Sequence, residues 1–384
     1  MVSVIMVLGL LMTTAKPVAA DAEYMMQVGA WGDEASRGNK GVRAEIQTRA
    51  YNVFSPVLTD SFWVGSTLQN DAFIQFGYEL QVGRYCLYAH RVGDHTVCLG
   101  SYDTFRGNDP RWFWEYWPYD KVIDFYCGNG PAASAGSDGS WHLYTIQPNF
   151  ANGWDFLLDG KIVQSFNNYA STTSPSLAKA VAEEVSSVPS ASGTLGPVGF
   201  RNLSYLKDDG WHQVKSLRAI SGCSVLNPNC EPDIKLPYGV TLAGPNDFIA
   251  GTGQQLRKNN DLLWVQQYKL TILSQFPASG EGTYDMGSRA HFSTTTPQPS
   301  NEILHQWMLD GWYDENGNLV TRSAQGSIMM DRPHTIRAEW YPAVIWTQVI
   351  TIIVAAIAIT FGLFMIMRRR YQKPKKATLS VKTE

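Results

Sequence analysis

The chain has 384 residues, of which 12% are aromatic and 17% are charged, and its formal net charge is −3. The segment 368–384 holds seven basic residues and one Glu, which contribute +6, so the rest of the chain sums to −9. An acidic, aromatic-rich chain of this kind argues against nucleic acid as a partner.

The N-terminal segment 1–20 predicts a secretory signal peptide. An uncharged apolar run extends from Val2 to Met12 and is too short to span a bilayer. The small residues Val18-Ala19-Ala20 then precede Asp21, which is typical of a cleavage site. We therefore expect the mature chain to begin at Asp21 outside the cell.

Segment 21–221 predicts an all-β domain. Short runs that alternate apolar and polar residues are separated by Gly, Asn, Asp and Pro. Leu158-Asp159-Gly160-Lys161 predicts a hairpin, because Asp-Gly tolerates the positive φ of a type I′ turn. Only Ser176–Val185 has a helical pattern, and it is weak. Many short strands with turn residues between them predict a β-sandwich or jelly roll. The expected strands include 42–48, 72–82, 84–88, 96–99, 121–126, 141–147, 154–158 and 161–166.

Two further segments complete the exterior part of the chain. Residues 222–263 are rich in Pro, Gly and Asn, and we interpret them as a connecting segment without a core of its own. Residues 264–341 predict a second, smaller β module, with strands at Tyr268–Leu273, Trp307–Trp312 and Thr335–Trp340. This module resembles the small Ig-like repeat found near the membrane in many prokaryotic surface proteins, which implies a stalk.

Residues 343–367 predict one transmembrane helix, because they form an uncharged apolar segment long enough to cross a bilayer. Tyr341 and Trp346 lie where an interfacial aromatic belt is expected. Arg368 begins a basic run, and positive residues remain on the cytoplasmic side. The chain is therefore predicted to be a single-pass type I protein of the plasma membrane, with 368–384 as its cytoplasmic tail.

Five cysteines lie in the exterior part, where an oxidising setting favours disulfides. Cys223 and Cys230 enclose a Pro/Asn turn and are expected to pair. Cys86–Cys98 would close a hairpin, Cys98–Cys127 is the alternative, and one thiol remains over. No Cys or His cluster has the spacing of a metal site, so we predict neither a metal nor a cofactor.

Candidate catalytic side chains lie in two strands that are rich in aromatic residues. In Phe73-Ile-Gln-Phe-Gly-Tyr-Glu79, alternation places Gln75 and Glu79 on one face. In Trp112-Phe-Trp-Glu-Tyr-Trp-Pro118, Glu115 shares a face with Trp117. Desolvation among aromatic side chains raises the pKa of a carboxyl group, which suits it to act as an acid or a base.

Together with Ser61-Phe-Trp-Val-Gly65, these segments resemble the glutamic peptidases, or eqolisins, in order and spacing. That family has a Trp-Val-Gly segment, a strand with Leu-Gln-Thr-Gly and a Tyr-Glu-Trp-Tyr-Pro segment. The resemblance spans residues 30 to 205 and implies a concanavalin-A-like β-sandwich. Phe76 departs from the family, which has a small residue after the Gln.

The resemblance also implies a catalytic dyad of a Gln and a Glu. The Gln matches Gln75, and the Glu lies in an Ala-Glu-Trp segment that Ala182-Glu183-Glu184 matches best. The carboxylate of Glu183 would take a proton from a water that attacks a peptide carbonyl, while Gln75 would donate a hydrogen bond to the oxyanion. Because Glu184 replaces the Trp, which of the two glutamates aligns stays open.

Substrate-binding side chains are expected at Trp63, Glu115, Trp114 and Trp117. Trp63 and Glu115 match residues around the cleft of the peptidases. The aromatic segment Trp112–Tyr119 also suggests an alternative, a non-catalytic surface domain whose rings stack on glycans. Core packing would account for most of these rings. A glycosidase is a third interpretation, but the sequence has no Glu-x-Asp-x-x-Glu motif. The expected partner is therefore an extracellular polypeptide or glycan.

Overall fold

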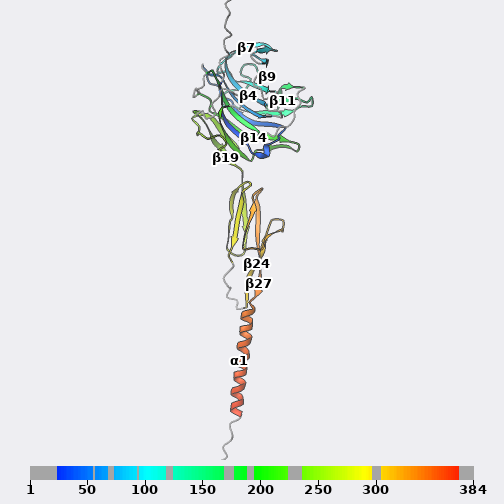
Figure 1. Cartoon of the computed structure of the whole chain (residues 1–384), viewed down its shortest axis with the longest axis vertical. Helices are drawn as coiled ribbons and strands as arrows, with labels where there is room; N and C mark the ends of the chain where they lie inside the picture. The colour runs from blue at the N-terminus through cyan, green and yellow to red at the C-terminus, as the bar shows by residue number, and fades with distance from the viewer. Residues whose placement is uncertain are drawn as a thin grey trace, which may run out of the picture. The chain divides into compact units, whose positions relative to one another are not determined.

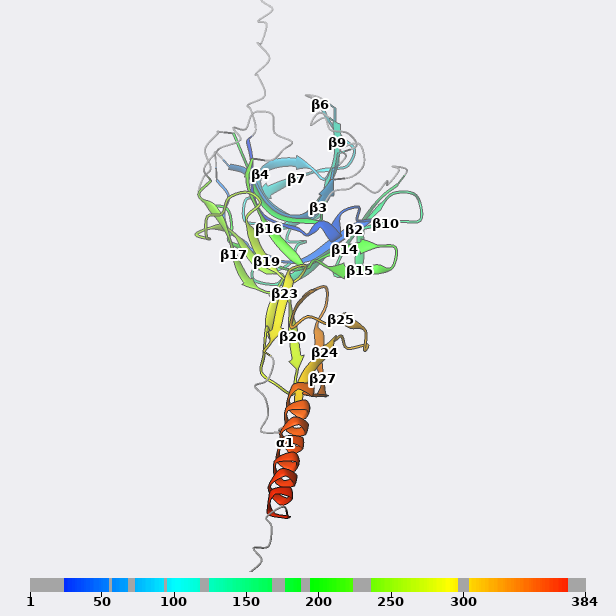
Figure 2. The ribbon, with the colours of Figure 1, turned by 60° about the horizontal axis from the view of Figure 1, so that its bottom comes forward.

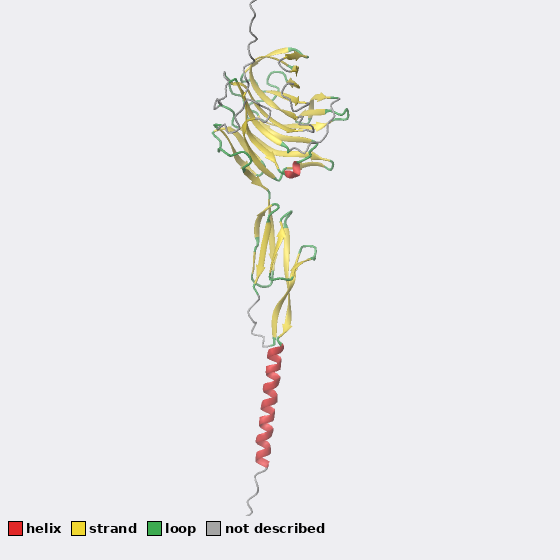
Figure 3. Cartoon of the chain, viewed as in Figure 1, coloured by secondary structure: helices red, strands yellow, loops and turns green. Residues whose placement is uncertain are grey.

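The structure is a computed structural model that describes residues 24–371, apart from 55–56, 68–72, 93–94, 118–123, 168–176, 188–193, 224–235 and 296–303. The chain forms two compact units, which divide between Gln266 and Gln267. Strands dominate both units (Figure 3). The expected signal peptide and residues 372–384 of the expected tail lie outside the described residues.

Two antiparallel sheets form the first unit (Figures 1 and 2). Sheet A has 11 strands in the order β19-β16-β1-β13-β3-β4-β8-β9-β5-β6, with β7 beside β4. Sheet B has 8 strands in the order β12-β11-β10-β2-β14-β18-β17, with β15 beside β14. The strands of sheet A are β1 (Tyr24–Gly32), β3 (Val57–Thr67), β4 (Phe73–Cys86), β5 (Tyr88–Val92), β6 (His95–Cys98), β7 (Tyr102–Arg106), β8 (Arg111–Trp117), β9 (Asp124–Asn129), β13 (Lys179–Ser186), β16 (Ser216–Cys223) and β19 (Leu262–Val265). Those of sheet B are β2 (Gly41–Gln47), β10 (Trp141–Pro148), β11 (Trp154–Leu158), β12 (Lys161–Phe166), β14 (Val198–Lys207), β15 (Gly210–Gln213), β17 (Tyr238–Gly244) and β18 (Asp247–Thr252). A short 3-10 helix, η1 (Glu34–Ser36), follows β1.

Apolar side chains from the facing sides of the two sheets form the main core. Alternation along each strand sends every second side chain inward. The ring of Phe76 on β4 lies 5.2 Å from the ring of Tyr144 and 5.5 Å from that of Phe156, both on sheet B. Fully burying one such aromatic side chain contributes roughly 1.5–3 kcal/mol. The predicted β-sandwich is therefore confirmed.

The weak helical pattern at Ser176–Val185 is wrong, because residues 179–186 form β13 in the middle of sheet A. Ala180 and Ala182 point into the main core and are fully buried. Alanine has a high helix propensity, but its small side chain also fits the space between β1 and β3. Tertiary packing therefore overrides the local preference.

The expected connecting segment 222–263 is also wrong, because its described part belongs to the sandwich. β17 and β18 extend sheet B, and β19 joins the edge of sheet A. Tyr238, Val240 and Phe248 are buried in the main core. The Gly and Asn residues that suggested a connection lie at turns and ends of these strands, such as Asn246 with φ 58°.

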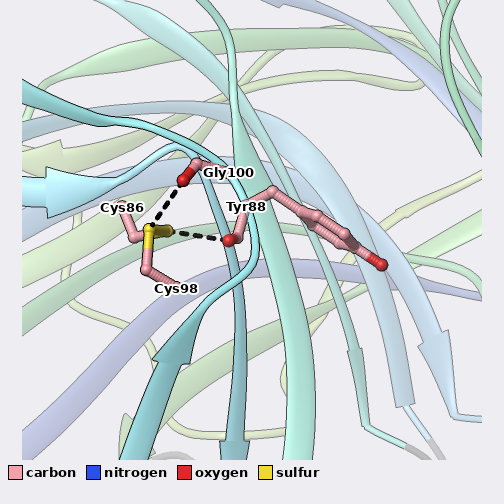
Figure 4. The surroundings of a disulfide bond; sticks show 4 residues. All are labelled: Cys86, Tyr88, Cys98 and Gly100. Carbon is pink, nitrogen blue, oxygen red and sulfur yellow. Dashed lines mark hydrogen bonds between the residues drawn. A yellow bond between two sulfur atoms is a disulfide. The ribbon is translucent and has the colours of Figure 1, made fainter.

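Two local features of the first unit agree with the sequence analysis. Asp159 and Gly160 have φ values of 52° and 78°, as a type I′ turn between β11 and β12 requires. Cys86 and Cys98 form a disulfide with a Cα–Cα distance of 5.5 Å. Figure 4 shows the carbonyl oxygens of Tyr88 and Gly100 beside its sulfurs. Cys230 lies outside the described residues, so its pairing with Cys223 remains a prediction.

The second unit begins with a β module of two sheets. One sheet has the order β22-β20-β27-β24-β25, with β20 and β27 parallel, and the other has the order β21-β23-β26. Leu270, Phe292 and Ile336 pack around the fully buried Trp312. The likeness to an Ig-like repeat remains a prediction. The strands are β20 (Gln267–Leu273), β21 (Ala278–Ser279), β22 (Gly282–Asp285), β23 (Arg289–Thr294), β24 (His305–Tyr313), β25 (Leu319–Thr321), β26 (Gln325–Met329) and β27 (His334–Val344).

A helix of 26 residues, α1 (Trp346–Tyr371), follows β27 (Figure 1). It is long and apolar enough to cross a bilayer, and none of its side chains is buried. The predicted span 343–367 starts earlier because β27 continues to Val344. The type I orientation and the plasma membrane remain predictions.

The place of β17, β18 and β19 in the sandwich can be tested by truncation. We expect a chain that ends at Gln266 to unfold cooperatively in urea. A chain that ends at Ser221 should lack this transition, because the main core loses Tyr238, Val240 and Phe248. Tryptophan fluorescence would follow unfolding. Equal cooperativity and equal midpoints in the two chains would contradict the fold assignment.

Candidate functional site

The candidate residues lie on the outer face of sheet A, which we define as the face that points away from sheet B. Strand register arranges them in rows that run across β1, β13, β3, β4 and β8. The Glu183 row consists of Gln27, Glu183, Ser61, Glu79 and Arg111. The Gln75 row, four residues further along the strands, consists of Trp31, Lys179, Gly65, Gln75 and Glu115.

Gln75, Glu115 and Trp117 come together on the outer face of sheet A, where the sequence analysis had paired only Glu115 with Trp117. The Nε2 of Gln75 donates a hydrogen bond of 2.6 Å to Oε2 of Glu115. The indole Nε1 of Trp117 donates to the same oxygen at 3.1 Å. Gln75 and Trp117 are 4% exposed. The amide of Gln75 is therefore directed toward β8.

Glu183 is paired with Gln27, a residue that the sequence analysis missed. The Nε2 of Gln27 donates a hydrogen bond of 2.5 Å to Oε2 of Glu183. Burial raises the pKa of Glu183 to about 7, against the opposing effect of the Gln27 hydrogen bond, and the charge of Glu115 raises it further. Gln27 carried the same signal as Gln75, since it is an amide inside an apolar strand.

Glu184 faces the interior and accepts a hydrogen bond of 2.5 Å from the hydroxyl of Tyr238 on sheet B. Adjacent residues of a strand point to opposite faces, so Glu183 and Glu184 are separated by the sheet. Glu183 is therefore the glutamate of this pair that shares the outer face with Gln75.

Gln75 and Glu183 share a face but do not meet. Their Cα positions differ by four residues along the strands, about 13 Å, and by two strand spacings, about 10 Å. The side chains also point apart, because Gln75 donates toward β8 and Glu183 accepts from β1. Directly across Gly65 from Gln75 lies Lys179. The structure therefore does not assemble the expected dyad.

The two other predicted binding residues have different positions. Trp63 lies on the outer face, 1% exposed, with its ring in edge contact with Phe73 at 5.4 Å. Trp114 instead points into the main core, where its ring stacks on Phe156 at 5.2 Å. The expectation that Trp114 contacts a ligand is wrong, because the period of β8 places it on the face opposite Glu115. Tyr119 lies outside the described residues.

A further carboxylate of the outer face, Glu79, accepts hydrogen bonds from Gln81 at 2.6 Å and from Asn129. Burial raises the pKa of Glu79 well above its usual range, and the charge of Glu115 adds to this shift. Glu79, Glu115 and Glu183 thus each accept from at least one side-chain amide. Within the described residues, no group of three or more His, Cys, Asp or Glu side chains is arranged to hold a metal ion.

Asp60 lies on the core side of β3, next to Ser61, and pairs across the strands with Glu184. The hydroxyl of Tyr51 donates a hydrogen bond of 2.6 Å to Asp60 Oδ2. Burial raises the pKa of Asp60 to about 7, although the Tyr51 hydrogen bond lowers it, and the charge of Glu184 raises it again. The interior of the sandwich therefore holds an acid that ionises near neutral pH.

Comparison with solved structures finds similar sandwiches. A scytalido-glutamic peptidase with a transition-state analogue inhibitor is 16% identical, has a TM-score of 0.36, and the match covers 60% of this chain and 98% of that one. SCP-B, a member of the eqolisin family in complex with the tripeptide Ala-Ile-His, is 15% identical with a TM-score of 0.32, and the match covers 61% and 98%. Porphyranase B from Zobellia galactanivorans is 12% identical with a TM-score of 0.26, over 50% and 76%.

The first unit is a β-sandwich of two packed antiparallel sheets, and its concanavalin-A-like type remains a prediction. Likeness at these scores says nothing of activity. No protein-family model matches the sequence. No curated protein matches it either.

The shifted pKa of Asp60 predicts how stability depends on pH. The folded pKa of about 7 lies above the usual 3.8, so the stabilisation is complete below about pH 4 and is lost as pH rises through 7. Asp60→Asn cannot ionise. At pH 8 we expect the free energy of unfolding of the variant to be up to about 4 kcal/mol larger than that of the parent, because each pKa unit corresponds to about 1.4 kcal/mol. Near pH 4 we expect the two free energies of unfolding to be equal.

Urea unfolding of the full chain in detergent at both pH values would measure this difference. Asp208→Asn is the matched control, because Asp208 has 86% of its side chain exposed. A stability gap between Asp60→Asn and the parent that is the same at pH 4 and pH 8 would contradict the assignment.

Proposed function

We propose that this chain binds an extended extracellular polypeptide at the outer face of sheet A and does not hydrolyse it. The observation that carries the proposal is the residue opposite Gln75. Across Gly65, β13 presents Lys179. Water activation by a Gln/Glu dyad requires a carboxylate that can accept a proton near the amide donor. An ammonium group has no lone pair for this role. The carboxylate beside Gln75 on the other side, Glu115, already accepts hydrogen bonds from Gln75 and Trp117.

The character of the outer face favours a polypeptide over a glycan. Amides, carboxylates and indole N–H groups complement the alternating donors and acceptors of a peptide backbone. Stacking on sugars would require accessible aromatic faces. Trp114 instead packs in the core, and Trp117 is 4% exposed with its Nε1 bonded to Glu115. The proposed setting is the cell surface, with α1 as a type I anchor.

Hydrolysis remains the second candidate, and one observation favours it. Glu183 has a pKa of about 7 and lies on the same face as Gln75, so it is partly ionised near neutral pH. It would act as the general base if a bound substrate drew Gln75 away from Glu115 and Glu183 away from Gln27. The two candidates share the same face and differ only in its chemistry.

A cleavage assay distinguishes the two candidates. The full chain in nanodiscs would be incubated with an unfolded protein from pH 3 to pH 8, and products would be followed by mass spectrometry. We expect no cleavage above background by the parent, by Gln75→Ala or by Glu183→Gln. Glu281→Gln is the matched control, because Glu281 lies in the second unit with 51% of its side chain exposed. Cleavage by the parent that disappears in both site variants, but not in the control, would establish the hydrolase instead.

The binding proposal makes its own prediction for Gln75. Gln75→Ala removes the hydrogen bond to Glu115 and leaves a half-buried carboxylate with fewer donors. We expect peptide affinity to fall about tenfold, which corresponds to about 1.4 kcal/mol. Fluorescence anisotropy of labelled random peptides on the full chain would measure it. Gln164→Ala is the control, on β12 at the edge of sheet B. An equal change in both variants would count against the outer face as the binding surface.

A further inference from the structure

Lys179 is a cation on the outer face that no described carboxylate neutralises. Its Nζ lies 5.9 Å from the centroid of the Phe73 ring. Burial lowers the pKa of its ammonium group, and no neighbouring charge opposes this shift. A poorly hydrated ammonium without an anionic partner is costly to bury. The position therefore calls for an anion.

Two indole donors flank Lys179 without an acceptor. Trp31 is the direct cross-strand partner of Lys179, and Trp63 is its diagonal neighbour beyond Gly65. Such neighbours lie within reach of long side chains. The Nε1 atoms of Trp31 and Trp63 are buried and have no hydrogen-bond partner among the described residues. Trp63 is 1% exposed, and its ring lies over Gly65, so it reaches the Gln75 row.

The neighbouring carboxylates of this face are engaged elsewhere. Glu115 accepts from Gln75 and Trp117, and Glu183 accepts from Gln27. Neither carboxylate forms an ion pair or a hydrogen bond with Lys179, whose strand neighbours in the Gln75 row are Trp31 and Gly65. Two indole N–H groups on β1 and β3, the strands that flank Lys179, thus have no acceptor among the described residues, and neither has the Lys179 ammonium.

We propose that Lys179, Trp31 and Trp63 form a subsite for a carboxylate group of the bound polypeptide. This inference rests on the proposed function and names the part of the ligand that binds. A carboxylate has two oxygens and about four lone-pair positions, so it can accept from the ammonium and both indoles at once. Its single negative charge matches the single positive charge of Lys179. Charge-assisted hydrogen bonds in a desolvated site are the stronger class.

The carboxylate has two possible sources in a polypeptide, the C-terminus and the side chains of Asp or Glu. Both are tested with random peptides made in four pools, with a free or an amidated C-terminus, and with or without Asp and Glu. Binding to the full chain in nanodiscs would be measured by fluorescence anisotropy. If the subsite binds a C-terminal carboxylate, the free-acid pools should bind more tightly than the amidated pools. If it binds a side-chain carboxylate, the pools that contain Asp and Glu should bind more tightly than those without them.

Lys179→Met removes the charge and keeps most of the side-chain volume. We expect it to weaken binding of the preferred pool at least tenfold and to abolish the preference between pools. Without peptide, the same variant should unfold at a higher temperature than the parent, because an unpaired buried charge is gone. Lys161→Met is the control, since Lys161 is exposed on β12, and it should change neither quantity.

The outcomes separate the two proposals. Binding of all four pools with equal affinity, unchanged in Lys179→Met, would overturn the carboxylate subsite and leave polypeptide binding intact. Lack of binding by every pool would overturn both proposals. A preference for one carboxylate source that depends on Lys179 would support the subsite and identify the source.

Discussion

The antiparallel pairing of β13, β3, β4 and β8 is the constraint on which the rest of the outer face depends. A slip of one residue in this register would turn every side chain to the other face of the sheet. Phe62, Phe76 and Ala182 are fully buried against sheet B, so such a slip would expose them. Core packing thereby determines that Gln75 and Glu183 point outward, and it also determines how far apart they lie.

The same packing governs how charge is tolerated. The carboxylates of the outer face have amide donors, as Glu183 has Gln27 and the half-buried Glu115 has Gln75. In the interior, tyrosine hydroxyls donate hydrogen bonds to Asp60 and Glu184. Hydrogen bonds reduce the cost of burying these acids, and the pKa values of Asp60 and Glu183 are also raised. Lys179 contacts the ring of Phe73 and has no hydrogen-bond acceptor among the described residues, unlike the acids of the site, which have hydrogen-bond donors.

The comparison of the two glutamates shows how much of the site could be predicted. Strand alternation correctly placed Gln75 on one face with Glu79 and Glu115 on one face with Trp117, because each pair lies in one short segment whose period is clear. The motif match at Ala182-Glu183-Glu184 did not reveal which residue of β13 faces Gln75. The residue of β13 that faces Gln75 depends on the register between β13 and β3. These two strands are far apart in the chain, and their register pairs Ala182 with Phe62. Gln27, from a third distant segment, was missed for the same reason.

The sequence by itself determined the all-β class, the hairpin at Asp159-Gly160 and an apolar segment long enough to cross a bilayer. These features arise from local period, turn chemistry and length, which neighbouring residues carry. Only the tertiary structure decided that β17, β18 and β19 complete the sandwich, that Trp114 lies in the core and that Lys179 stands opposite Gln75. These positions depend on the register between strands that are distant in the chain. Burial of both sheets together determines that register, so no single segment of the sequence predicts it.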